Sequence, residues 1–153
     1  MLIADRTACP DNSYMEMVLD KAIEVAPSLL PKHLDYLTLI FLYKCVRFGD
    51  VSTLDDLMNR YNEIHAVFHA PSTDNAISYF NMLGLLTLSL GNGDEVLSKT
   101  YCFNKQEVQQ VLPPEYIVIP GDYSLTPVGI ALAIFNSHSK WNRKFNLSTW
   151  IHE

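Results

Sequence analysis

Two histidines have a spacing that could do chemistry: His65 and His69 stand four residues apart in a segment with a helical pattern. Imidazoles at positions i and i+4 of a helix face the same side and can bind one metal ion. The run is His-Ala-Val-Phe-His, so the glutamate that follows the first histidine in zinc-protease helices is absent, and a metal site demands more ligands than two. Because His65 also falls on an apolar stripe, the pattern favours a half-buried, hydrogen-bonded histidine near a helix end, and we expect no metal site.

The remaining patterns of this kind are typical of turns and helix starts. Gly91-Asn92-Gly93 lacks the third glycine and the Lys-Ser/Thr of phosphate-binding loops, so it predicts a turn. The acid pair Asp55-Asp56 stands at an expected helix start, where it interacts favourably with the helix dipole. No Gly-x-Ser-x-Gly occurs, and no cysteine stands beside a histidine. We therefore expect no catalytic, cofactor-binding or metal-ligating residues, no cofactor and no enzyme activity.

The last part of the chain concentrates basic and aromatic residues. Residues of these two kinds can bind single-stranded nucleic acid by stacking, and the same residues can anchor a segment to its own domain or to a partner. Large aromatic side chains left in water are a liability, which favours docking on the domain. The candidate interaction residues are Lys140, Trp141, Arg143, Lys144, Phe145 and Trp150.

The composition is that of one folded domain. Of the 153 residues, 48% are hydrophobic and 18% are charged, which is enough apolar chain to bury a core and excludes wholesale disorder. The formal net charge of −6 disfavours nucleic acid as a partner, because phosphate binders carry a basic footprint. Cys9, Cys45 and Cys102 are far apart and odd in number, which indicates reduced thiols and a cytoplasmic protein. No signal-peptide pattern occurs at the N-terminus, and no apolar stretch is long enough to cross a bilayer.

Hydrophobic periodicity predicts two helices before residue 50. The first begins after Ser13, a plausible N-cap, and stops at Pro27. The second is expected over residues 32–48, ended by Gly49-Asp50. It is apolar almost all round, so it should be buried on several sides at the centre of the molecule.

Two more helices follow before the period changes. Ser52 is expected to cap the third, with Asp55 in the position of the capping-box glutamate and an apolar stripe that reaches Phe68. The fourth is expected to begin within residues 71–74 and to continue to about Met82. Gly84 is well placed as its C-terminal residue.

From residue 85 the pattern alternates, which predicts a strand over residues 85–90 that could pair with residues 123–125. Between them we expect a short helix at residues 104–112 and a short strand at residues 116–119. Thr126 caps a last helix with Pro127 at its first position, where the missing N–H costs nothing.

Two sets of residues carry a family resemblance. Three helices, then GLL (residues 84–86), an intervening excursion and YSLTPVG (residues 123–129) resemble a winged-helix module, in which a strand pairs with another that runs into Leu-Thr-Pro-x-Gly and a closing helix. The runs DKAIEVAP (20–27), HLDYLTLIFLYK (33–44) and STLDDL (52–57) resemble an uncharacterised bacterial family and are similar to abortive-infection alpha proteins.

The resemblance implies a fold more than a chemistry. It implies a non-catalytic role in bacteria connected to phage defence, with this chain as the C-terminal half behind a separate upstream segment. The family supplies no catalytic residues to carry across. We expect a mainly α single domain over residues 1–153 with a small antiparallel sheet in a winged-helix-like arrangement. Its parts are a helical segment at 1–30, a core at 31–136 with an insertion at 91–122, and a tail at 137–153.

The function expected from these features is a protein-interaction or regulatory module, with a protein partner or self-association and no membrane. A DNA-binding winged-helix regulator is the first alternative, but the expected fourth helix carries no Lys or Arg to approach phosphates. A small enzyme with a site assembled from His65, Tyr61 and Asp122 is the second alternative.

Overall fold

The computed structural model describes residues 13–69, 75–88, 100–111, 123–141 and 143–151, and over these residues the protein is mainly α-helical with one small antiparallel sheet. This confirms the expected fold class. In chain order the elements are α2 (Tyr14–Val25), a 3-10 turn (Ala26–Ser28), α3 (Pro31–Lys44), α4 (Leu54–Val67), α5 (Asn75–Met82), β1 (Leu86–Leu88), α7 (Lys105–Val111), β2 (Tyr123–Leu125), α8 (Pro127–Lys140) and a second 3-10 turn (Leu147–Thr149).

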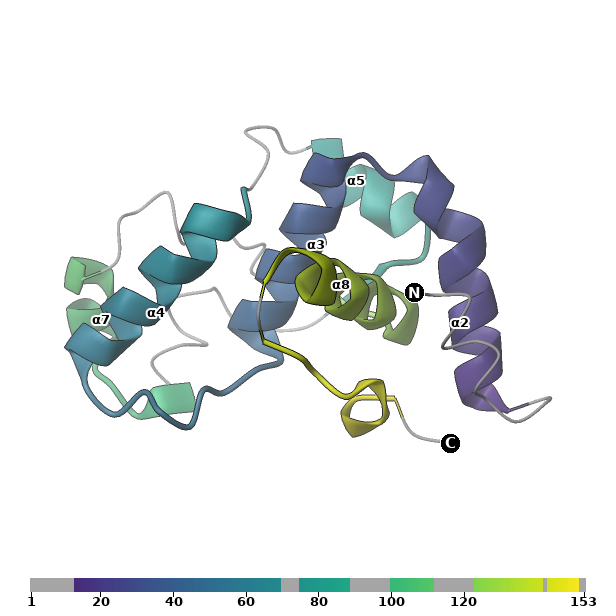
Figure 1. The fold of residues 1–153 in the computed structure, drawn as a ribbon. Helices are drawn as coiled ribbons and strands as arrows, with labels where there is room; N and C mark the ends of the chain where they lie inside the picture. The colour runs from purple at the N-terminus through teal and green to yellow at the C-terminus, as the bar shows by residue number, and fades with distance from the viewer. Residues whose placement is uncertain (1–12, 70–74, 89–99, 112–122, 142, 152–153) are drawn as a thin grey trace.

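α3 and α8 form the centre of the molecule, with α2 on one side and α4 and α7 on the other (Figure 1). Every residue of α3 from Asp35 to Tyr43 is buried, so the expectation of a central helix that is apolar almost all round is confirmed. α8 is also buried on several faces, through a run that includes Ala131 and Ala133. α2 packs on α8, and its N-cap is Ser13, whose hydroxyl accepts from the Glu16 N–H at 2.9 Å, as expected.

α3 ends four residues before the expected position. Its last residue is Lys44 and its C-cap is Cys45, so Gly49-Asp50 does not end it. The connection that follows α3 is irregular, but its residues Val46, Phe48 and Val51 are buried. Their apolar side chains therefore extend the apolar pattern of the sequence beyond the end of the helix. The Phe48 N–H donates to the hydroxyl of Tyr101 at 2.7 Å, which replaces the bond that a continuing helix would supply.

The N-cap of α4 is Thr53, so the prediction of Ser52 with Asp55 was wrong by one residue. The Thr53 hydroxyl accepts from the Asp56 N–H at 3.1 Å, and an Asp56 oxygen accepts from the Thr53 N–H at 3.2 Å, which completes a capping box. The same oxygen accepts from the N–H and the hydroxyl of Ser52 at 3.2 and 3.1 Å. Asp56 therefore satisfies two backbone donors where Asp55 could not.

β1 and β2 pair antiparallel, with Leu86 opposite Leu125 and Leu88 opposite Tyr123, which confirms the expected pairing. Gly84 precedes β1 with a φ of 74°, the left-handed conformation expected at the end of α5. β2 leads directly into α8, whose N-cap is Thr126 and whose first residue is Pro127, as expected.

Several sequence predictions lie outside the described residues. These are the strand at 116–119, the turn at 91–93, the start of the fourth helix at 71–74 and most of the insertion at 91–122, of which residues 100–111 are described and contain the expected short helix as α7. In the part of the chain that the structure describes, no helix has the length and apolar character needed to cross a membrane.

Candidate interaction surfaces

The candidate interaction residues near the end of α8 lie on a segment that crosses the protein's own surface. We call Trp141 and residues 143–151 the strap; it continues from the end of α8 and carries the second 3-10 turn (Figure 1). Lys140 immediately precedes the strap, and its Nζ binds both oxygens of Asp35 on α3 at 2.8 and 2.7 Å. The Asp35 side chain is only 7% exposed, so Lys140 neutralises a buried carboxylate.

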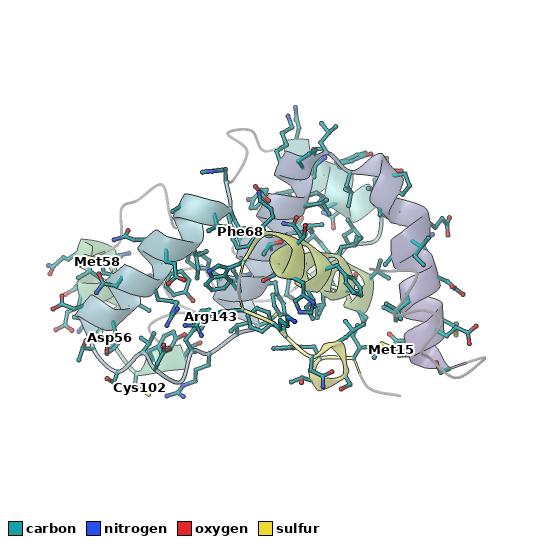
Figure 2. The ribbon with its side chains drawn as sticks, in the orientation of Figure 1. Met15, Asp56, Met58, Phe68, Cys102 and Arg143 are labelled. Carbon is teal, nitrogen blue, oxygen red and sulfur yellow. The ribbon has the colours of Figure 1, made fainter. Side chains whose placement is uncertain are left out.

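The first part of the strap contacts α4 and the α3–α4 connection. Trp141 is buried, its indole N–H donates to Glu63 at 3.0 Å, and its ring meets those of Phe48 and Phe68 edge to face at 6.1 Å. Arg143 lies over the Trp141 ring at 5.6 Å and binds Asp50 at 3.5 Å. Phe68 and Arg143 are labelled in Figure 2 on the side of the strap that faces α4.

The second part of the strap lies on α3. The ring of Phe41 is met edge to face by Phe145 at 5.3 Å and by Trp150 at 5.0 Å. The Trp150 indole N–H donates to the carbonyl of Cys45 at 3.1 Å, which satisfies an acceptor at the end of α3. The Phe145 N–H donates to Nε2 of His138 at 2.9 Å.

Five of the six candidates thus meet the domain itself, and Lys144 is exposed. This arrangement is the docking that the aromatic content favoured. Whether these residues also contact a partner stays a prediction. Their counterparts on the domain, Asp35, Asp50 and Glu63, were not predicted, because no local pattern links them to residues 78 to 105 positions away.

A second surface is the outer face of α5. Asn75, Ser78 and Asn81 are exposed there, and Met82 is 73% exposed, while Ala76 and Phe80 are buried. Tyr79 links this helix to the turn before α3: its hydroxyl donates to the carbonyl of Ser28 at 2.6 Å.

Leu30 lies in the same turn and is 53% exposed. Neither Met82 nor Leu30 was among the predicted site residues. Met82 could have been found from the outward positions of the predicted helix, whereas the exposure of Leu30 depends on tertiary packing.

The two histidines are not brought together on a metal. Nε2 of His65 lies 2.8 Å from the hydroxyl of Tyr43, and its ring is half-buried in the last turn of α4, which confirms the expected hydrogen-bonded histidine. The exposed His69 uses its backbone N–H to reach Asp35 at 3.3 Å. Across the residues described here, no group of three or more His, Cys, Asp or Glu side chains is placed to hold a metal ion.

Two residues of the enzyme alternative can be located. Tyr61 is fully buried beside Tyr43, with ring centroids 4.6 Å apart, and its hydroxyl donates to the carbonyl of Leu42 at 3.2 Å. Burial raises the pKa of Tyr61 well above its usual value, which opposes a role in proton transfer near neutral pH. Asp122 lies outside the described residues.

One cavity of about 150 Å³ opens beside the start of α4, lined by Asp50, Val51, Asp56, Asn59, Arg60 and Glu63. Its charges are largely paired within the protein, because Arg60 binds Asp50 and, at 3.1 Å, Glu63. The carboxylate of Asp56 serves the cap of α4. The arrangement supports an ion-pair network more than a ligand site.

Fold and surfaces together define a mainly helical protein with a two-stranded antiparallel sheet and aromatic side chains docked on their own domain. The chain belongs to an uncharacterised protein family, whose model matches residues 1–121. This confirms the coarser part of the expected resemblance. Neither the curated proteins nor the solved structures contain a match to the chain.

Proposed function

We propose that this protein is a non-catalytic protein-interaction module that associates with a second copy of itself through the outer face of α5. The observation that carries the proposal is the chemistry of that face: Asn75, Ser78, Asn81 and Met82 are exposed and none of them is charged. Met82 is the most exposed of the large hydrophobic side chains described.

Charge favours this face for self-association. Two copies of a chain with a net charge of −6 repel one another, so a contact between copies is least opposed where the surface carries no charge. In a two-fold contact each residue meets its counterpart across the axis. An antiparallel pair of α5 helices centred near the small side chain of Ser78 would set Met82 of each copy beside Asn75 of the other.

The decisive measurement is the solution mass by light scattering, across protein concentration and from about 0.1 to about 1 M salt. We expect a dimer that persists at high salt, since its contact is uncharged. Met82→Glu should weaken the dimer at least about tenfold, because it removes the one large apolar side chain of this face and buries a charge in an uncharged contact. Met17→Glu is the matched control, because Met17 is 63% exposed on α2, away from α5, and its substitution should change nothing. A monomer at every concentration would contradict self-association.

A DNA-binding winged-helix regulator is the second candidate. The order α5, β1, β2 and α8, with β2 running into Thr126-Pro127, favours it. Against it stands α5, which lacks any Lys or Arg where a recognition helix needs contact with phosphates. Titration of duplex DNA at two salt concentrations separates the candidates, because DNA binding would weaken steeply with salt.

The proposed setting is a bacterial cytoplasm, within a winged-helix-like protein related to phage defence. The family resemblance of the runs at 20–27, 33–44 and 52–57 supports the bacterial origin and the connection with defence. Free thiols support a reducing compartment, because neither Cys45 nor Cys102 is in a disulfide.

A further inference from the structure

The strap is joined to the rest of the protein by side-chain contacts. The Trp141 N–H donates to the carbonyl of Ser137 at the end of α8, and the other backbone–backbone bonds of the strap stay within it: Thr149 N–H donates to Asn146, and the N–H groups of Trp150 and Ile151 donate to Leu147. The Asn146 side chain also accepts from Ser148 N–H at 3.1 Å, which closes the 3-10 turn from inside. In the described part of the chain, no backbone–backbone hydrogen bond links residues 143–151 to another element.

The contacts that hold the strap are those of a protein–protein interface. Trp and Arg are among the residue types that carry most of the binding energy where proteins meet, and Phe is enriched there. In the strap, residues of these types contact the rings of Phe41 and Phe48. The indole N–H groups of the two tryptophans and the backbone N–H of Phe145 donate to Glu63, Cys45 and His138. These three partners lie in α4, at the C-cap of α3 and in α8, and over the described residues none of these helices takes a backbone–backbone hydrogen bond from residues 143–151.

An ion pair that water can reach adds to these anchors. Asp50 binds both Arg60 and Arg143, and the two guanidinium groups lie over the ring of Phe48 at 5.1 and 5.4 Å. The side chains of Arg143 and Asp50 are 39% and 56% exposed, so this contact is screened by salt. Arg60 is 11% exposed and would stay with α4 when Arg143 leaves.

We propose that the strap is a releasable cover: it detaches as a unit, and its detachment exposes the aromatic surface around Phe41 together with its own Phe145 and Trp150. The closed form withholds these side chains from other proteins, and the open form presents them. The binding of a protein to the open form rests on the proposed interaction function. The detachment of the strap does not depend on that proposal.

The chain offers a direct probe of opening, because both of its tryptophans, Trp141 and Trp150, belong to the strap. In a urea titration, we expect the indole emission to shift to the red at a lower urea concentration than the loss of far-UV helicity. Coincident transitions would show that the strap leaves only when the whole protein unfolds, and would overturn the proposal.

Trypsin provides a second readout, since Lys144 is exposed but cleavage there requires the strap to leave the surface. The measurement is the rate at which the fragment beginning at Phe145 appears, followed by mass spectrometry. Asp50→Asn should raise this rate about two- to fivefold, the range set by an exposed ion pair. The matched control is Asp55→Asn, an exposed aspartate on the first turn of α4 whose loss should leave the rate unchanged.

A variant of the aromatic anchor makes the test independent of charge. Phe145→Ala should raise the cleavage rate about tenfold or more, because it removes the contacts with Phe41 and Trp150. Phe103→Ala is the control, as Phe103 is half-buried and stacks on Tyr101 away from the strap. Equal acceleration by the two would mean that cleavage follows global stability, against the proposal. The Met82→Glu variant should be cleaved by trypsin at the same rate as the wild type. A failure of the α5 dimer proposal can therefore be distinguished from a failure of the strap proposal.

Discussion

At the scale of single residues, the N-terminus of α4 allows the contributions of two neighbouring residues, Ser52 and Thr53, to stability to be compared. Thr53 is the N-cap, whereas Ser52 donates to Asp56 from outside the helix. Thr53→Ala should lower the free energy of unfolding by about 1 kcal/mol, because it orphans the Asp56 N–H. Ser52→Ala should cost clearly less, since the backbone N–H of residue 52 still reaches Asp56. Urea unfolding measures both, and equal costs would contradict the observed cap.

The carboxylate of Asp56 makes this cap sensitive to pH. Hydrogen bonds from the backbone of Ser52 and Thr53 lower the pKa of Asp56 below its usual value. A carboxyl with a lowered pKa in the folded state stabilises the protein above its unfolded pKa, and this contribution is lost as the pH falls through the folded pKa. The stability difference between wild type and Asp56→Asn should therefore be constant near neutrality and shrink below about pH 4. A difference that is independent of pH in chemical denaturation would contradict this.

The two described cysteines should differ in reactivity. Burial raises the pKa of Cys45 to about 11, so little thiolate forms near pH 8, whereas Cys102 is exposed on the side of the protein that carries α4 and α7 (Figure 2). Iodoacetamide at about pH 8 should alkylate Cys102 at least about tenfold faster than Cys45. Peptide mass spectrometry gives both rates, and in urea they should converge. Comparable rates in the folded protein would show that Cys45 is accessible.

At the scale of elements, the close approach of α8 to the sheet depends on Gly129. A Cβ at this position would lie 2.5 Å from the carbonyl oxygen of Leu85, which also accepts the Thr126 N–H. Because the obstacle is backbone, Gly129→Ala must push α8 away from β1, at a cost of about 1–3 kcal/mol. Gly49→Ala is the control, since nothing lies within 4 Å of the added carbon. Equal stability of the two variants in urea would refute the close approach.

Elements could be predicted from the sequence where their signals are local. Ser13, Gly84 and Thr126-Pro127 specify a helix start, a helix end and a second start through their own backbone preferences, and the structure has all three. The end of α3 could not be predicted in this way, because the apolar pattern continues into buried residues of the following connection. Ser52 and Thr53 are equally good caps by type, and the reach of the Asp56 carboxylate decided between them.

At the scale of the whole molecule, the sequence predicted the residues of the strap but not where they bind. Their composition favoured docking, while the surface they dock on is assembled from α3, α4 and the connection between them. The α5 surface was missed for another reason. The amphipathic pattern places Met82 on the outward side of the helix, but an outward position alone does not mark a residue for an interaction, and its exposure of 73% is seen only in the structure.

The buried carboxylate of Asp35 joins three helices and gives the last prediction. It accepts from Lys140 and Asn136 on α8 and from the N–H of His69 just beyond α4. Lys140→Met would leave this charge buried without a counter-ion, which is more costly than the loss of an exposed ion pair. Because Lys140 is itself 36% exposed, water will compensate in part, and we expect a loss of about 2 kcal/mol of unfolding free energy.

The control for this loss is Lys144→Met, four residues further on, which removes an equal charge from an exposed side chain and should cost little. A double-mutant cycle with Asp35→Asn isolates the pair: the double variant should lose less stability than the sum of the single variants, because the second substitution removes the unpaired charge that the first one creates. Strict additivity in urea unfolding would mean that Asp35 and Lys140 are not coupled, and that the packing of α3 on α8 does not depend on this ion pair.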